Sequence, residues 1–306
     1  MSSLVSTGLR FTRTSADNLG VDFQTLCLKI GRSENLPVLP TAVLNLLKMF
    51  GDENVSSREL ANVIGQDAGL AAKVLRVASS PVFGTGSCET ISRAIGLIGI
   101  NRMKQIAVTL GYQQFSAEKS QVPDFDKMYF WEHCKATATV AKEIMARVNR
   151  SKQDNAYMAG LIHDVGFLAM EKFAPTALNQ AILVSKTRNL NIIEAEEEVC
   201  GFNHNMVSDE LAQRWKLAPY LQDAIAHHNC PAESTIDEEI CAVIAVANTV
   251  AYEMGCPPVR GVSGNHTSVE FLPLLNLTTE DITEIVDRAK IEIEESKSQI
   301  GARRSA

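Results

Sequence analysis

The stretch AGLIHDVGFLAMEKF (residues 159–173) places an adjacent histidine and aspartate, His163 and Asp164, within an apolar segment that favours a helix. Further histidines lie on both sides of this pair: His133, His204, His227 and His228. A single histidine on an apolar helix face is more often a hydrogen-bonded core residue than a metal ligand. Five histidines and one aspartate in one helical region instead predict side chains that converge on a metal ion.

The spacing of these residues limits how they can bind metal. Neighbours on a helix point about 100° apart, so His163 and Asp164 cannot approach one ion from the same direction. A two-metal site solves this problem when a carboxylate bridges the ions. Imidazole-rich sites suit iron, manganese, nickel or zinc better than calcium or magnesium. In an enzyme, such a site lowers the pKa of bound water and holds a phosphate.

Apolar residues recur three and four apart through almost every stretch that looks ordered, which predicts an all-α fold. Ser56 or Ser57 caps one short helix, and Pro219 begins another that reaches His228. We expect one continuous helix from Thr90 to Leu110. We expect another from a cap at Asp154 to Leu168.

Composition excludes some classes of function. The chain has 306 residues, 45% of them hydrophobic, which is enough to bury a core. Its net charge of -7 argues against a nucleic-acid or anionic-membrane surface along the whole chain. A local basic patch of Arg93, Arg102 and Lys104 is interpreted as a solvated helix face. Residues 57–78 resemble a helix-turn-helix, but their second half is too apolar to read bases.

The seven cysteines are scattered and form no CxxC pair, which indicates unpaired thiols in a reducing compartment. No apolar run approaches the roughly 18 to 20 residues that span a bilayer. We therefore expect a cytoplasmic protein with no membrane partner. His266 lies in a Gly- and Ser-rich stretch and is expected on a surface loop.

Several long stretches together resemble the HDOD family, a branch of the HD superfamily related to the HD-GYP phosphodiesterases. They are LPVLPTAVLNLLKMF (36–50), ELANVIGQDAGLAAKVLRVASSPVFG (59–84), TISRAIGLIGINRMKQIAV (90–108), WEHCKATATVAKEI (131–144), the opening stretch, GFNHNMVSDELAQRWKLAPYLQDAIAHHN (201–229) and AVANTVAYEMG (245–255). The resemblance implies an all-helical fold, with an N-terminal helical subdomain packed on an HD-like core. It also implies a role in bacterial signalling, usually without demonstrated catalysis.

The resemblance also suggests how the chain is divided. Residues 1–24 would form a flexible tail and residues 25–256 the HDOD domain, with a helical subdomain at 25–120 and an HD-like subdomain at 121–256. Residues 257–306 would be a linker followed by an amphipathic helix. That helix is expected to dock on the same chain, with docking on a second copy as the alternative.

Carried onto this chain, the family's metal-ligand positions are His133, His163, Asp164, His204, His227, His228 and Asn248. Three positions depart from the catalytic pattern: Asn248 replaces its last aspartate, Tyr129 an acidic residue and Phe167 a lysine. The GYP segment is absent. Asp164 is then the one carboxylate ligand, which is too little charge to hold two ions firmly. The sequence therefore predicts at most one divalent transition metal (iron, manganese, nickel or zinc).

Two functions remain open. The first is a non-catalytic regulatory protein that acts by binding a signalling protein or a ligand, for which a nucleotide is a candidate and a homodimer a candidate assembly. The lost aspartate and lysine favour it. The second is a metal-dependent phosphohydrolase or phosphodiesterase, which the retained histidines favour. Nucleic acid is not an expected partner of either. A signal could leave through the N-terminal subdomain, the loop from Pro81 to Ser92, or the C-terminal helix.

Overall fold

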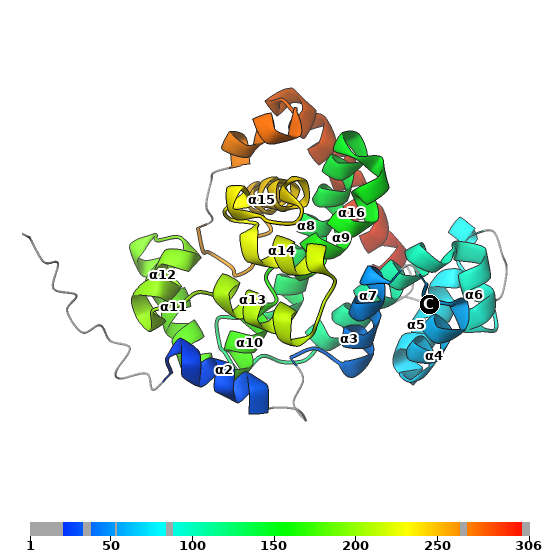
Figure 1. The fold of residues 1–306 in the computed structure, drawn as a ribbon, viewed down its shortest axis with the longest axis horizontal. Helices are drawn as coiled ribbons and strands as arrows, with labels where there is room; N and C mark the ends of the chain where they lie inside the picture. The colour runs from blue at the N-terminus through cyan, green and yellow to red at the C-terminus, as the bar shows by residue number, and fades with distance from the viewer. Residues whose placement is uncertain (1–20, 33–37, 53, 84–87, 264–267, 302–306) are drawn as a thin grey trace, which may run out of the picture.

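The computed structural model describes residues 21–32, 38–52, 54–83, 88–263 and 268–301. These residues form α-helices joined by short turns (Figure 1), and their extended structure is one isolated β-bridge between Asn191 and Ser263. The prediction of an all-α fold is confirmed. The predicted tail, up to residue 20, and His266 lie outside the described residues.

The N-terminal part holds six helices and two 3-10 turns. They are α2 (Phe23–Arg32), α3 (Thr41–Lys48), η1 (Met49–Gly51), α4 (Ser57–Gly65), α5 (Ala68–Ala78), η2 (Pro81–Phe83), α6 (Ile91–Ile98) and α7 (Ile100–Ser116). Helices α3 to α7 pack on one another and form the right-hand lobe of Figure 1. Ser56, one of the two residues predicted to cap this helix, caps α4 and forms a capping box with Glu59. Helix α2 stands apart from this lobe and packs on α10 and α13.

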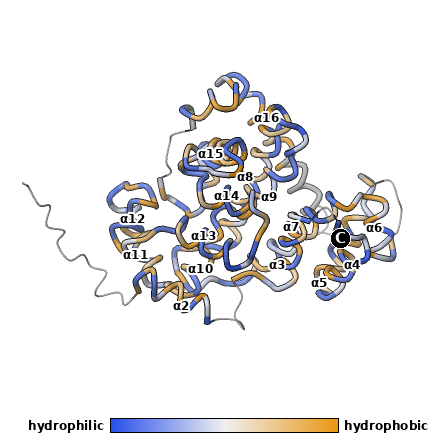
Figure 2. Tube along the Cα trace, in the orientation of Figure 1, coloured by the Kyte–Doolittle hydropathy of each residue, from blue (hydrophilic) through white to orange (hydrophobic). Residues whose placement is uncertain are grey.

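The rest of the chain forms the larger body of the molecule. Its elements are α8 (Lys127–Val148), η3 (Arg150–Lys152), α9 (Gln153–Ile162), α10 (Gly166–Phe173), α11 (Pro175–Arg188), α12 (Ile192–Cys200), α13 (His204–Arg214), α14 (Pro219–His227), η4 (Pro231–Glu233), α15 (Glu238–Glu253), η5 (Ser268–Leu275) and α16 (Thr279–Gly301). Helices α8, α9 and α15 pack on one another at the centre, and α14 lies against α9 and α15. Hydrophobic and hydrophilic residues alternate along these helices (Figure 2), so each can turn an apolar face to the core.

Two predicted helices are each broken in two. The helix expected from Thr90 to Leu110 ends at Ile98 because Gly99 has a left-handed backbone with φ +88°. The helix expected from Asp154 to Leu168 is broken between Ile162 and Gly166. Asp154 was also the wrong cap, since it lies within the first turn of α9. Helical periodicity continues across both breaks, so the sequence pattern concealed them.

The C-terminal helix docks on the same chain, as expected. Ile285 and Ala289 of α16 are buried, and α16 packs against α8. Arg147 of α8 forms ion pairs with Asp281 and Glu284 of α16. The segment predicted as a linker also contains η5, which packs on α15.

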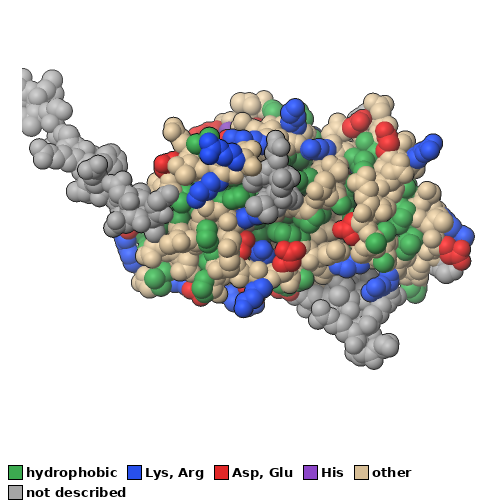
Figure 3. Space-filling view, turned by 90° about the horizontal axis from the view of Figure 1, so that it is seen from below, with side chains coloured by type: hydrophobic (Ala, Val, Ile, Leu, Met, Phe, Trp, Pro, Cys, Tyr) green, Lys and Arg blue, Asp and Glu red, His purple; other side chains and the backbone are tan. Residues whose placement is uncertain are grey.

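The surface of the described residues is of mixed character. The face in Figure 3 shows Lys and Arg side chains among acidic and hydrophobic ones. All seven cysteines lie in the described residues, and none of them forms a disulfide. Within the described ranges, none of the helices combines the length and the hydropathy needed to span a membrane.

Gly166 brings α10 into close contact with α13. Its amide donates to Ser208 Oγ at 2.7 Å, and a Cβ built on Gly166 would lie 2.0 Å from the carbonyl oxygen of His204. No side chain fits in that space unless the two helices separate. Glycine at this position therefore sets how closely the Asp164 turn approaches His204.

We predict that Gly166→Ala lowers the free energy of unfolding by about 1–3 kcal/mol, because overpacking forces α10 away from α13. Urea denaturation followed by circular dichroism measures the effect. Gly96→Ala is the matched control, because Gly96 lies within α6 with open space where a Cβ would be placed. That control should be neutral or slightly stabilising. Equal stability of both variants would show that the contact between α10 and α13 is loose.

Candidate metal centre

The break between α9 and α10 places His163 and Asp164 side by side. His163 is the C-cap residue that follows α9, and Asp164 lies in the turn that leads to Gly166. The amide of Phe167 donates to the carbonyl of Asp164 at 3.0 Å, which closes the turn. His163 Nε2 lies 3.1 Å from Asp164 Oδ2. The turn thus brings two adjacent side chains together at one point in the core.

The two oxygens of Asp164 each face two imidazoles. Oδ2 lies 3.4 Å from His133 Nε2 and 3.1 Å from His163 Nε2. Oδ1 lies 3.4 Å from His204 Nε2 and 3.5 Å from His228 Nε2. The four rings come from α8, α9, α13 and the end of α14, and all five side chains are buried. The carboxylate therefore lies between two pairs of histidines.

The Nδ1 atom of each ring is held by a hydrogen-bond acceptor. For His133, His163 and His228 the acceptors are the carbonyls of Cys256 at 2.7 Å, Gly160 at 2.9 Å and Ile225 at 3.0 Å. A carbonyl only accepts, so Nδ1 carries the proton in these rings. The Nε2 lone pairs of His133 and His163 then face Asp164, and this orientation is typical of metal-binding histidines. Nε2 of His228 also lies near Asp164, but it accepts a hydrogen bond from Asn229 Nδ2 at 2.9 Å.

These atoms fit a metal ion better than a closed hydrogen-bond network. The Nε2 atoms of His133 and His163 and Oδ1 of Asp164 are buried without a hydrogen-bond partner. Two ligands bound about 2.1 Å from one ion stand roughly 3.0–3.4 Å apart. The observed separations of 3.1–3.5 Å lie close to that range. In addition, ligand atoms of His133, His163 and Asp164 all lie within 4.8 Å of one another.

A second carboxylate lies behind His204. Glu196 of α12 is fully buried, and its Oε2 accepts from His204 Nδ1 at 2.6 Å and from the His204 amide at 2.9 Å. It orients the imidazole and adds a second negative charge to the centre. The sequence interpretation missed Glu196, although a signal was present. It falls in the buried stripe of α12, with Ile192, Ala195, Val199 and Cys200.

The pKa values reflect this dense charge. Burial raises the pKa of Asp164, but the surrounding histidines outweigh burial and hold that pKa well below its usual value. Burial lowers the pKa of His204, but Glu196 and Asp164 outweigh burial and raise it to about 10. The pKa of His163 is lowered by burial. Without a metal ion, His204 therefore carries an additional proton at neutral pH, between two carboxylates.

The structure places the remaining predicted positions differently. His227, adjacent to His228, directs Nε2 to Asp223 at 3.8 Å and is partly exposed, so it is not brought to the Asp164 cluster. Asn248 lines a cavity that Asp164, His204 and His228 also line, and its Oδ1 has no hydrogen-bond partner. Tyr129 instead donates to the carbonyl of Gly255 at 3.3 Å. Helical geometry explains the His227 result, because its neighbour His228 already points inward.

Phe167, at the position where the resemblance implied a lysine, fills space beside the centre. Its buried ring stacks on His204 with centroids 4.1 Å apart and also packs on Phe125 and Phe130. The cavity in front of Asp164, His204, His228 and Asn248 has a volume of about 30 Å³. That volume holds an ion with one or two waters.

We predict that Glu196→Gln weakens metal binding about 10- to 100-fold, because the ring of His204 loses its charged partner. Titration of metal-stripped protein with zinc in competition with a chromogenic chelator measures the affinity. Glu198→Gln is the control, since Glu198 is exposed on the same helix and pairs with Arg188. Unchanged affinity in Glu196→Gln would mean that His204 does not bind the ion.

The fold is shared with several solved structures. A crystal structure of an HDOD domain protein of unknown function from Geobacter sulfurreducens superposes with a TM-score of 0.67 at 24% identity, covering 92% of this chain and 96% of that one. A Shewanella amazonensis SB2B protein, named for a proposed phosphohydrolase activity, superposes with a TM-score of 0.64 at 20% identity, covering 87% of this chain and 93% of that one. A Marinobacter aquaeolei VT8 protein, named for a proposed role in signal transduction, superposes with a TM-score of 0.68 at 20% identity, covering 96% of this chain and 62% of that one.

Sequence comparison assigns the family. An uncharacterised protein of Treponema pallidum (strain Nichols) is 22% identical over 251 residues, covering 79% of this chain and 48% of that protein. The chain thus spans about half the length of this curated relative. The sequence profile of the HDOD domain matches residues 36–231. Since this match covers more than half of the 306 residues, the chain belongs to the HDOD family.

Proposed function

We propose that this protein is a non-catalytic signalling protein whose HD-type pocket binds one divalent transition metal: iron, manganese, nickel or zinc. The proposed ligands are His133, His163, Asp164, His204 and His228, with Asn248 as a weaker neutral ligand. Four imidazoles oriented by their Nδ1 partners support this ligand set. A bound ion would act as a Lewis acid and would tie together helices from across the chain.

The size of the cavity is the observation that carries the non-catalytic proposal. A volume of about 30 Å³ leaves no room for a nucleotide beside the histidines. Phe167 also replaces the cation that would hold a substrate phosphate, with a ring packed tightly on His204. The site would therefore hold an ion without access for a phosphodiester.

A metal-dependent phosphohydrolase is the second candidate. It is favoured by Asp164, which presents each oxygen to a separate pair of imidazoles, as a carboxylate bridging two ions does. Glu196 adds negative charge that the sequence interpretation did not count. For turnover, the segments around the cavity would have to move apart to admit a substrate.

The regulatory proposal requires a partner to carry the signal. We expect a signalling protein, with a homodimer as the alternative assembly, in the cytoplasm. The seven cysteines form no disulfide, which supports a reducing compartment. The fold shared with the Marinobacter protein, named for signal transduction, is compatible with this role but shows the fold alone.

The metal content of protein purified without added metal or chelator tests the proposal, by inductively coupled plasma mass spectrometry. We predict about one equivalent of a transition metal in the wild type and loss of at least 90% of it in His163→Ala, because one of few ligands is removed. His227→Ala is the matched control and should retain its metal, since this ring faces Asp223. Equal metal content in wild type and His163→Ala would refute the metal centre.

Catalysis is tested on the metallated protein. We predict no release of phosphate or nucleotide from cyclic dinucleotides and nucleoside monophosphates with manganese or iron, by chromatography over several hours. Turnover that His163→Ala and Asp164→Ala both abolish would replace the regulatory proposal with the phosphohydrolase. Turnover that persists in both variants would come from a contaminant.

A further inference from the structure

A second hollow lies where four parts of the fold meet, apart from the metal centre. It is a groove of about 740 Å³ between α7 of the N-terminal lobe, α8 and α9 of the core, and α16. Its charged lining residues are Arg102, Lys142, Arg147, Arg150, Arg288, Glu143 and Asp154. Five cations against two carboxylates is a local excess of positive charge in a chain whose net charge is -7.

Acidic residues of α16 offset part of this charge. Arg147 pairs with Asp281 and Glu284, and Glu284 Oε2 also lies 3.7 Å from Arg288. When these two carboxylates are included, the groove still carries five cations against four anions among the side chains that the structure describes. The excess therefore falls on the side of the groove away from α16.

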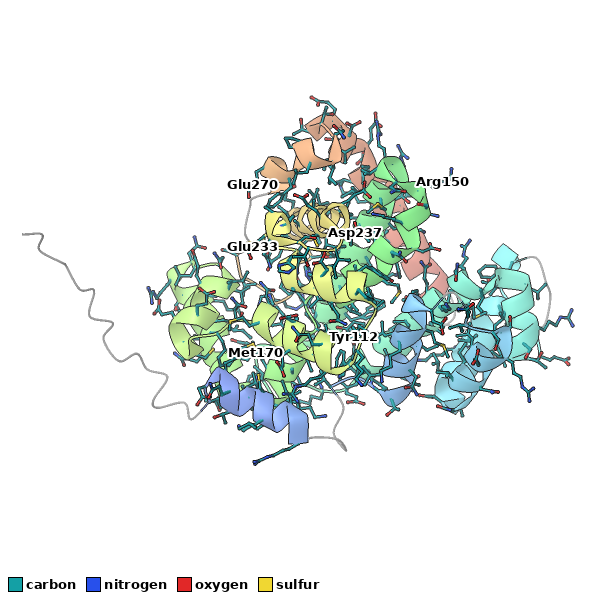
Figure 4. The ribbon with its side chains drawn as sticks, viewed as in Figure 1. Tyr112, Arg150, Met170, Glu233, Asp237 and Glu270 are labelled. Carbon is teal, nitrogen blue, oxygen red and sulfur yellow. The ribbon has the colours of Figure 1, made fainter. Side chains whose placement is uncertain are left out.

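Arg102 and Arg150 are the two arginines on that side of the groove. Both are exposed and line the groove, and neither has an ion pair with a carboxylate among the described residues. Arg102 rests its guanidinium 5.5 Å from the ring centroid of Phe83, which leaves its N–H groups available. Arg150 lies at the outer edge of the molecule, in the turn between α8 and α9 (Figure 4). Lys104, by contrast, turns inward and donates to the carbonyl of Met49.

The lining determines which ligand the groove can recognise. A guanidinium presents a planar fork of donors that matches two oxygens of a phosphate. Among the described residues, the lining contains no aromatic ring for a base to stack on, and its one apolar side chain is that of Ala146. Recognition must therefore come from the anionic groups. A volume of about 740 Å³ lies within the range of small-ligand sites.

We propose that this groove binds a chain of phosphates, either free polyphosphate or the polyphosphate group of a nucleotide. Arg102 and Arg150 grip it from the two sides of the groove, α7 and the α8–α9 turn. These sides already touch, since Gln105 of α7 donates to the carbonyl of Asp154 in α9 at 3.4 Å. A bound polyphosphate thus bridges the N-terminal lobe and the core, separately from the metal centre.

Isothermal titration calorimetry at low salt, on protein as purified, tests the proposal with tripolyphosphate, adenosine triphosphate and adenosine as probes. We predict that both phosphate compounds bind and that adenosine does not. The paired variant Arg102→Gln/Arg150→Gln should weaken binding at least about tenfold, because two charge-assisted contacts are lost. His163→Ala should bind as the wild type does, which separates this groove from the metal centre.

The matched control is Arg58→Gln/Arg93→Gln, which removes the same charge from exposed arginines of α4 and α6 outside the groove. It should keep wild-type affinity. Equal affinities for the two phosphate compounds would identify the phosphate chain as the recognised group, and tighter binding of the nucleotide would identify a nucleotide site. The proposal is overturned by no binding at millimolar tripolyphosphate, by equal weakening in both paired variants, or by loss of binding in His163→Ala.

Discussion

The buried carboxylate of Asp164 is the constraint on which the rest of this structure depends. A negative charge in the core is tolerated only where positive or coordinating partners surround it. Four imidazoles do so here, and each is held by its own acceptor. The break after Ile162 exposes the carboxylate to the rings, and Gly166 allows α13 to approach closely enough for His204 to reach it. The packing of the core helices therefore serves one small polar centre.

Much of this arrangement could be predicted from the sequence, because periodicity reveals helices and an imidazole within an apolar stripe reveals an inward position. The predictions were wrong where the apolar pattern and the local backbone geometry favour different structures. Gly99 and the turn at His163 each separate two helices. The apolar pattern continues across both breaks, so a prediction from helical periodicity alone gave one helix in each place. His227 and His228 look equivalent in sequence, but a helix can turn only one of them inward. Glu196 was not predicted as a site residue, although its position matches the buried stripe of α12.

The charge balance of the proposed metal centre bears on whether the site would bind one ion without catalysis or would support hydrolysis. Two carboxylates, one direct and one behind His204, match the charge of a single divalent ion. An aspartate at position 248 would supply negative charge for a second ion, and a lysine at position 167 would supply positive charge for a phosphate. This chain has the uncharged Asn248 and Phe167 at these positions. Under the proposed function, these histidines would hold one ion in a cavity of about 30 Å³.

One contact of the metal centre extends beyond it. The ring of His133 is held by the carbonyl of Cys256, at the point where the chain leaves α15 for η5 and α16. A movement of this C-terminal arm, which consists of η5 and α16, would release the ring of His133 and change the affinity of the site for a bound metal ion. Because free-energy coupling between two sites is reciprocal, a partner that pulls on the arm would change metal affinity by the same factor as metal changes the partner's affinity. The arm and the ion would then report on each other, which is the working principle of a sensor.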